Sequence, residues 1–386
     1  MLVIVETHPI QYHAPVWAYA AALGVPLHVV YGAMFSVAGY CDPEFQAVVQ
    51  WDTSLLRGYS HEVLPPDLRG ASHDYDSVSS QGLSRVLTRL HPTALLASGY
   101  AHPLDRRTVF EAWRRRIPLL WRAEANDSAR QRSPVKTLVR DLALSNLYRS
   151  VAACLSIGQE ATAQYRRLGV PPHKIFHSPY AVSTTPFQPT ESDRQFLRKH
   201  TREQLGLDPQ ARVVLFSGKL SERKGVDLLL QAIAALPQSE RPVLLLLGDG
   251  ALRAQLKQSS LPVQRILVGF QPQHALSPYF HAADLLALPS RHSETWGLVV
   301  NEALHHGLPA VVSDAVGCRH DLVVPGVTGE ICPRGDVQGL SAALHRCLAY
   351  AGTSASRSRC RQQVSPYSIE AAARGLQQAW EAIIQR

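Results

Sequence analysis

The stretch 290–303 reads Ser290-Arg-His-Ser-Glu294-Thr-Trp-Gly297-Leu-Val-Val-Asn-Glu302-Ala and indicates the fold class most directly. The apolar run before it, residues 285–288, ends at Pro289, which is typical of a buried parallel strand that runs into a loop. A helix is expected to begin near Gly297, where the missing side chain lets the backbone approach a ligand closely. The first turn of such a helix carries unpaired amides and the positive end of the helix dipole, so it favours an anion such as a diphosphate. These amides belong to Leu298, Val299 and Val300.

Two glutamates stand eight positions apart across this turn. Glu294 would lie in the loop, and Glu302, about one turn inside the helix, would accept hydrogen bonds from vicinal hydroxyls such as those of a ribose. An alternative is that Glu302 solvates the helix surface while Glu294 caps its first turn, and for a lone pair of glutamates this alternative is the better one. The neighbouring loops decide between the two readings.

Three more strand ends carry turns of the same kind. Strand 213–217 leads into Gly218-Lys219, and Lys224-Gly225 follows before the next helix. Two lysines on one glycine-bearing loop can reach both phosphates of a leaving nucleoside diphosphate. The other two strand ends are 243–247, followed by Gly248-Asp249-Gly250, and the strand that ends at Gly269-Phe270.

The C-terminal half resembles a retaining glycosyltransferase of the GT-B fold, in the group classed as glycosyltransferase family 4. The motifs above lie in that family's order, together with Gly307-Leu-Pro-Ala-Val-Val-Ser-Asp314-Ala-Val-Gly317, and the resemblance covers residues 212–329. It implies that Lys219 and Lys224 bind the diphosphate of a nucleoside diphosphate sugar. It implies further that Glu294 contacts the sugar and Glu302 the ribose, and that no metal or other cofactor is required. The remaining donor-binding residues that it implies are Gly218, Asp249, Phe270, Gly297, Leu298 and Val299.

Position 219 departs from the family pattern, in which arginine is commoner than lysine. Lys219 replaces a planar, forked donor with a point charge, so the geometry of the phosphate contact should change without the contact being lost.

Apolar strands alternate with amphipathic helices throughout the chain, which is the pattern of doubly wound parallel sheets. At 386 residues the chain exceeds what one hydrophobic core usually supports, so two Rossmann-like domains are expected to face a central cleft, as in the GT-B fold. The expected division is an acceptor-binding domain at 1–185, a linker at 186–204, a donor-binding domain at 205–365 and a closing helix at 366–386 that crosses back to the first domain.

Acceptor recognition is expected in the first domain, where polar loops leave the carboxyl ends of strands and face the cleft. The first loop, Thr7-His-Pro-Ile-Gln11-Tyr12-His13-Ala-Pro-Val-Trp17, resembles a subset of the family with this His-Pro-Ile-Gln-Tyr-His phrase. An alternative is that its aromatic side chains only pack beneath the next helix, which suits Trp17. In a later loop the family often has a histidine, whereas this chain has Arg122 and Glu124, and Glu124 becomes a candidate for orienting the acceptor hydroxyl. The acceptor-side candidates are Gln11, Tyr12, His13, His102, Arg122 and Glu124.

The composition excludes several classes of protein. With 46% hydrophobic and 18% charged residues, the chain is globular and not disordered. No apolar run approaches the roughly 20 residues that cross a bilayer, and residues 1–8 do not resemble a secretion signal. Six scattered cysteines without a CxxC pair are expected to be reduced, which favours the cytoplasm. His305-His306 makes a poor metal site, because adjacent helical side chains point about 100° apart.

The net charge of +8 is unevenly placed, because residues 105–174 hold 14 Lys and Arg against 6 Asp and Glu and so carry the whole excess. Within them, segment 106–116 is expected to place Val109, Phe110 and Trp113 on one side of a helix. A solvated basic face is one explanation. The other is contact of the 106–140 stretch with an anionic membrane surface or with a polyprenyl diphosphate acceptor. No recognised motif accompanies the charge, so nucleic acid is not an expected partner.

These observations predict an enzyme that moves a hexosyl group from a UDP- or GDP-sugar to a glycan, lipid-linked or small-molecule acceptor, with retention at the anomeric carbon. It would be cytoplasmic, and peripheral on the membrane if the basic stretch binds lipid. Three alternatives stay open: a GT-B sugar-nucleotide epimerase, a catalytically inactive nucleotide-sugar-binding protein and a dinucleotide oxidoreductase. The last is disfavoured because Arg253 occupies the third glycine position of the dinucleotide fingerprint.

Overall fold

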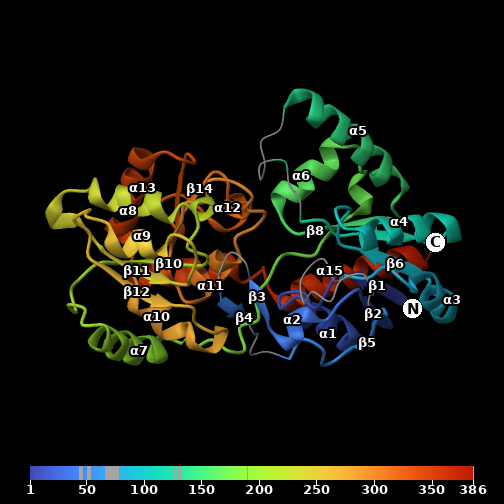
Figure 1. The fold of residues 1–386 in the computed structure, drawn as a ribbon, viewed down its shortest axis with the longest axis horizontal. Helices are drawn as coiled ribbons and strands as arrows, with labels where there is room; N and C mark the ends of the chain where they lie inside the picture. Colours follow the sequence, from blue (N-terminus) through green and yellow to red (C-terminus); the bar gives the residue numbers. More distant parts are fainter. Residues whose placement is uncertain are drawn as a thin grey trace.

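The computed structural model describes residues 1–42, 47–49, 54–65, 78–124, 127, 133–188 and 190–385. Two domains lie side by side, each built on a parallel sheet, and the two ends of the chain lie in the same domain (Figure 1). This arrangement confirms the predicted fold class, with two Rossmann-like sheets and a cleft between them.

The first domain has a seven-stranded parallel sheet in the order β5-β2-β1-β6-β7-β8-β9, and a separate antiparallel ribbon, β3-β4. Strand β1 is buried along its whole length because apolar clusters cover both faces of the sheet: Val3 and Val5 enter one cluster, Leu2 and Ile4 the other. The elements are β1 (Leu2–Glu6), α1 (Ala14–Ala22), β2 (Leu27–Tyr31), α2 (Phe35–Ala38), β3 (Tyr40–Asp42), β4 (Ala47–Val49), β5 (Ser60–Val63), α3 (Leu83–Leu90), β6 (Ala94–Ala97), α4 (Pro103–Arg115), β7 (Leu119–Trp121), α5 (Pro134–Ser150), β8 (Ala153–Ser156), α6 (Gln159–Arg167), the 3-10 helix η2 (Pro172–Lys174) and β9 (Ile175–His177).

The second domain has a six-stranded parallel sheet in the order β12-β11-β10-β13-β14-β15. Its central strands, β10, β11 and β13, consist almost entirely of apolar residues and are buried almost throughout. The elements are α7 (Glu191–Gln204), β10 (Val213–Ser217), η3 (Glu222–Lys224), α8 (Val226–Ala234), η4 (Gln238–Glu240), β11 (Val243–Leu247), α9 (Arg253–Gln258), β12 (Arg265–Gly269), η5 (Gln273–Ala275), α10 (Ser277–Ala282), β13 (Leu285–Leu288), α11 (Leu298–His305), β14 (Ala310–Ser313), α12 (Arg319–Leu322), β15 (Gly329–Cys332), α13 (Val337–Tyr350) and α14 (Ser354–Val364).

The segment expected to be a linker differs from the expectation, because residues 191–204 form the helix α7, which packs on α10 of the second domain. Thr190 caps this helix by accepting a hydrogen bond from the Asp193 amide at 3.1 Å. Two arginines on α7 then bind the buried carboxylate of Asp284: Arg198 at 2.7 Å and Arg202 at 3.2 Å. The helix therefore belongs to the second domain, and the connection between the domains is shorter than expected.

The last helix, α15 (Ile369–Ile384), packs on α1, β8 and β9 of the first domain, and Ser368 caps its start. A second contact between the domains lies at α6 and α12. The Asp321 carboxylate accepts from the Gln159 amide at 3.0 Å, and Arg319 pairs with Glu160 at 2.6 Å. These contacts hold the two sheets on either side of the cleft. Among the described residues, no helix combines the length and apolar character needed to span a bilayer.

Candidate active site

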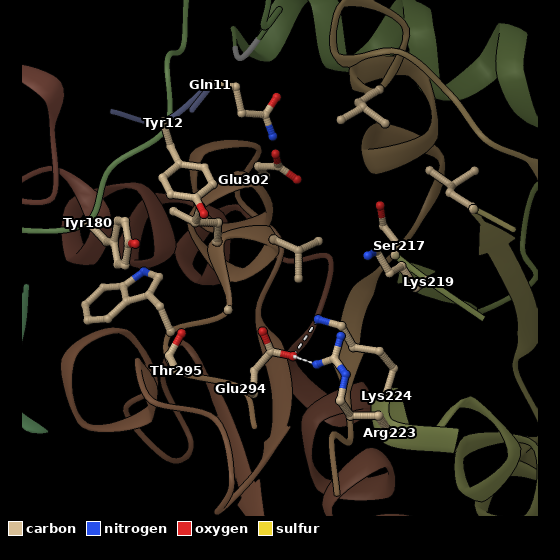
Figure 2. Close-up of a pocket in the computed structure, with 18 of the residues that line it drawn as sticks. Gln11, Tyr12, Tyr180, Ser217, Lys219, Arg223, Lys224, Glu294, Thr295 and Glu302 are labelled. Atoms are coloured by element: carbon tan, nitrogen blue, oxygen red, sulfur yellow. Dashed lines mark hydrogen bonds and ion pairs between the residues drawn. The ribbon is translucent and has the colours of Figure 1, made fainter. Parts of the chain in front are cut away.

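A cavity of about 400 Å³ lies in the cleft between the two domains (Figure 2). Most of its lining comes from loops that follow the carboxyl ends of β10, β11, β12 and β13, which is where doubly wound sheets bind ligands. The structure brings most of the predicted donor-side residues together here: Gly218, Lys219, Lys224, Phe270, Glu294, Gly297, Leu298, Val299 and Glu302 all line the cavity.

Glycines let these loops pack backbone against backbone. Gly225 has φ +70°, and a Cβ there would collide with the carbonyl oxygen of Pro289. Gly248 has φ +121°, and a Cβ there would collide with the carbonyl oxygen of Gly218. The loops after β10, β11 and β13 are therefore fixed to one another at positions that no other residue fits without strain.

Glu294 is the best-held carboxylate of the cavity. Its Oε2 accepts from the Nζ of Lys224 at 2.5 Å and from the Ser290 hydroxyl at 2.9 Å, and the Arg223 guanidinium lies 3.9 Å away (Figure 2). The backbone of its loop is held as well, because the Gly317 amide donates to the Glu294 carbonyl at 3.0 Å. The 307–317 motif therefore supports the Glu294 loop, because the turn at its end supplies the Gly317 amide.

Three cations lie on one loop of the cavity: Lys219, Arg223 and Lys224. The sequence analysis singled out the two lysines and missed Arg223, although it stands between them in the same motif. A bidentate ion pair supports this loop from behind, because Asp227 at the start of α8 binds Arg291 with both distances at 2.7 Å. The loop after β10 and the loop after β13 are thus tied by charge as well as by backbone packing.

The first turn of α11 faces the cavity as predicted, but not with all three amides. Gly297 begins it with φ +102°, and a Cβ there would lie 3.0 Å from side chains of Leu288 and Val316. Leu298 and Val299 line the cavity. The Val300 amide instead donates to the Gly297 carbonyl at 2.9 Å, so it is not available to an anion.

Glu302 lies farther along α11, on the opposite side of the cavity from Glu294 (Figure 2). Burial raises the pKa of the Glu302 carboxyl to about 7. Gln11 extends toward it from the first domain (Figure 2). Its Oε1 is buried and has no hydrogen-bond partner among the described residues. Glu302 and Gln11 are therefore two polar groups that a ligand between the domains could satisfy.

Three of the six acceptor-side candidates line the cavity: Gln11, Tyr12 and Glu124. His13 and Arg122 do not, because both are buried beneath its floor. Arg122 donates to His13 Nε2 at 2.7 Å, so Nε2 accepts and the ring proton is on Nδ1, which faces Glu6 at 2.7 Å. These two residues thus form a buried polar cluster with Glu6, and Glu124 lies above it with its Oε1 3.5 Å from His13 Nε2.

Two further candidates lie away from the cavity. His102 is the N-cap of α4: its ring accepts from the Leu104 amide at 3.1 Å, while Asp105 accepts from the His102 amide at 3.1 Å. Asp249, expected to bind the donor, instead pairs with Arg253 at 3.0 Å and accepts from the Gly250 amide at 2.8 Å. Both side chains are engaged in local structure at the start of the next helix.

Aromatic residues that the sequence analysis left unassigned also line the cavity. Trp296 lies in the loop between β13 and α11, and Tyr180 lies between β9 and α7, where the chain passes from the first domain to the second. Trp296 donates to Asn301 at 2.8 Å, and the Asn301 amide donates to the Tyr180 carbonyl at 3.3 Å. Trp296 could have been singled out from the sequence as an aromatic residue two positions after Glu294. Its connection to Tyr180 could not, because only the fold brings the two residues together.

The histidine pair 305–306 packs within the second domain. His306 is buried, with Nε2 2.7 Å from the Ser277 hydroxyl and Nδ1 2.7 Å from the Glu302 carbonyl oxygen. Burial lowers the pKa of His306 to about 3 and that of His305 to about 4. No group of three or more metal-ligating side chains was found in the part of the chain that the structure describes.

Known proteins resemble the second domain most clearly in sequence. Residues 198–365 match the family described as glycosyl transferases group 1. A D-inositol 3-phosphate glycosyltransferase from Xylanimonas cellulosilytica is 32% identical over 206 residues, which cover 52% of this chain and 49% of that protein. An alpha-D-kanosaminyltransferase from Streptomyces kanamyceticus is 27% identical over 205 residues, which cover 52% of each. The chain therefore spans about half the length of these curated relatives.

Solved structures resemble the chain over its whole length. HepE from Anabaena, in complex with UDP, matches with a TM-score of 0.72 at 17% identity over 99% of both chains. Sucrose-phosphate synthase from Thermosynechococcus elongatus matches with a TM-score of 0.70 at 19% identity, over 100% of this chain and 99% of that one. At these identities the likeness concerns the fold. The similarity in sequence to the glycosyl transferases group 1 family is therefore carried by residues 198–365, and the chain as a whole has the GT-B fold.

Proposed function

We propose that this chain is a retaining glycosyltransferase that moves a hexosyl group from a UDP- or GDP-sugar to a hydroxyl of a glycan, lipid-linked or small-molecule acceptor. One observation carries the proposal: three cations and two carboxylates of the second domain line a single cavity between the domains. The cations, Lys219, Arg223 and Lys224, suit a diphosphate, and the carboxylates suit sugar hydroxyls on either side of it.

The donor has one natural position in this arrangement. Its diphosphate lies between the cationic loop and the amides of Leu298 and Val299. Glu302 then accepts from the ribose hydroxyls, and Glu294 contacts the sugar. The base lies toward Phe270, which lines the same cavity. The crystal structures of HepE with UDP and with UDP-glucose show that a protein of this fold binds such a donor, which supports the assignment.

In this reaction the protein mainly positions the donor and acceptor and stabilises the charge of the leaving diphosphate. The bond between the anomeric carbon and the leaving phosphate oxygen breaks, and the acceptor oxygen bonds to the same face of that carbon. The acceptor proton passes to the departing diphosphate. Lys224 lies between the sugar and the leaving group, because it donates to Glu294 and also faces the position of the diphosphate.

The acceptor enters from the first domain. Glu124 is the only carboxylate that the described part of this domain contributes to the cavity, so it is the candidate for orienting the acceptor hydroxyl. Gln11 and Tyr12 lie beside the same opening and provide further polar contacts. His13 and Arg122 are buried and do not line the cavity, so we assign them a structural role and no contact to substrate.

Two measurements test the proposal. In a thermal-shift panel of UDP, GDP, ADP and their sugars, one nucleotide should stand out, because a ligand at 100 times its Kd stabilises the folded state by about 2.7 kcal/mol. Release of nucleoside diphosphate should then depend on an added acceptor. Nucleotide binding without acceptor-dependent turnover would favour an inactive binding protein. Interconversion of nucleotide sugars without any acceptor would favour an epimerase.

The stereochemistry is tested separately. The anomeric configuration of the product, read by NMR coupling constants, should equal that of the donor. An inverted product would reject the retaining mechanism while leaving the donor site intact.

A further inference from the structure

Helix α5 (Pro134–Ser150) presents an apolar surface to solvent. Four side chains on it, at the spacing of one helical face, are between 64% and 72% exposed: Val135, Leu138, Val139 and Leu142. We call this set the α5 stripe. Only Leu144 and Tyr148 of the helix are buried. A helix of a globular protein normally turns such a stripe inward, so the outward-facing α5 stripe marks a contact surface.

Ion pairs tie the polar side of α5 to the domain, which keeps the stripe outward. Arg140 on α5 binds Asp127 at 2.9 Å, and Asp141 on α5 binds Arg167 of α6 at 2.5 Å. Arg167 also binds Asp127 at 2.9 Å, so the four charges form one network. Turning the stripe toward the protein would break this network. The exposed position of the stripe is therefore built into the fold.

The basic residues around α5 are of two kinds. Helix α4 carries three arginines of the stretch that was expected to contact a membrane. All three bind the buried carboxylate of Glu111 at 2.6 to 2.9 Å: Arg107, Arg114 and Arg115. They stabilise α4 and are not free to bind lipid. By contrast, Lys136 and Arg149 are exposed on α5 itself. Trp113, which is 74% exposed, lines a surface hollow together with Ser150 at the end of α5.

We propose that the α5 stripe inserts into the surface of an anionic lipid bilayer, with Lys136 and Arg149 against lipid headgroups. An apolar helical face flanked by cations and an exposed tryptophan is the chemistry of an interfacial helix. A second copy of the chain fits less well, because a symmetric contact through α5 would bring like charges together. The inference goes beyond the proposed function, since the stripe is separate from the nucleotide cavity.

The test uses the full chain in flotation with vesicles of phosphatidylcholine alone and of phosphatidylcholine with phosphatidylglycerol. The wild type should float with the anionic vesicles. Leu138→Asp with Leu142→Asp should lower vesicle binding more than tenfold, because two charges would enter the apolar layer. Phe196→Asp is the matched control: Phe196 is 69% exposed on α7 of the other domain, and its replacement should change nothing. Lys136→Glu should weaken binding about fivefold or more, since each cation near an anionic surface contributes about 1 kcal/mol.

Two checks separate this inference from others. Val135→Asp with Val139→Asp should repeat the loss of binding, and circular dichroism should show all variants folded. The thermal shift caused by nucleotide should stay unchanged in every stripe variant, so failure here is independent of failure of the donor site. The proposal is overturned if the wild type does not float with anionic vesicles, or if the stripe variants float like the wild type. It is also overturned if sedimentation without lipid shows that the wild type is a dimer and that the stripe variants are monomers.

Discussion

Donor affinity should depend on pH through Glu302. Burial raises the pKa of the Glu302 carboxyl to about 7, so at neutral pH the group is about half protonated before donor binds. Only the carboxylate accepts from both ribose hydroxyls, so binding requires ionisation and lowers this pKa. The sign follows: affinity is fully developed above pH 7 and is lost as the pH falls through 7. If binding returns the pKa to an ordinary value, Kd at pH 6 should be about tenfold higher than at pH 8, or about 1.4 kcal/mol.

The assay is calorimetric titration between pH 5.5 and 8.5 with a nucleoside diphosphate sugar, whose phosphates do not titrate in this range. The two histidines that follow on the same helix do not titrate there either, because burial lowers their pKa values to about 4 and about 3. Glu302→Gln is the control: it should bind more weakly at pH 8 by about 1 to 3 kcal/mol, with an affinity that does not change with pH. A flat profile in the wild type, or the same slope in Glu302→Gln, would refute the assignment of this residue to the ribose.

Three further changes test the rest of the site. Lys224→Ala should lower kcat more than 100-fold if Lys224 stabilises the departing diphosphate, since comparable donors contribute about 10² to 10³; a change confined to KM would mean that it only binds. Glu294→Gln should lower kcat with little loss of nucleotide affinity, because it contacts the sugar, and steady-state kinetics with calorimetry would show this; wild-type kcat would contradict it. Glu6→Ala leaves the buried Nδ1–H of His13 without its acceptor and should destabilise the protein by about 1 to 3 kcal/mol in denaturant unfolding; an unchanged free energy of unfolding would contradict this role.

The parallel sheets could be predicted because buried strands leave a direct mark on the sequence. Strands such as β10 and β11 are unbroken apolar runs that end at glycine turns, and the turns place the cavity at their carboxyl ends. The edge strands β5 and β9 of the first domain leave no such mark, and no strand could be assigned to them from the sequence. Each is only partly buried, so Ser60–Val63 and Ile175–His177 carry no such run. The edge strand β12 is also only partly buried, but it keeps an apolar run that ends at Gly269, so it could be predicted.

Residues whose role depends on a distant charge could not be placed from the sequence. Segment 191–204 reads as polar linker, yet it is a helix because Arg198 and Arg202 meet Asp284, more than 80 positions away. The arginines of α4 read as a free basic patch, yet Glu111 binds three of them. The sequence shows that these arginines are present, but only the fold shows which carboxylates neutralise them.

The His-Pro-Ile-Gln-Tyr-His phrase shows how the two kinds of information combine. Its position after β1 correctly brings Gln11 and Tyr12 to the cavity. The next residue turns inward, where His13 joins the carboxylate of Glu6 to the guanidinium of Arg122 in a place that water does not reach. Arg122 in turn lies 4.9 Å from the centre of the Tyr180 ring, which also lines the cavity. The phrase therefore builds a charge-balanced floor for the acceptor side, and a substitution at His13 should disturb Arg122, and through it Tyr180, before it disturbs any contact to the donor.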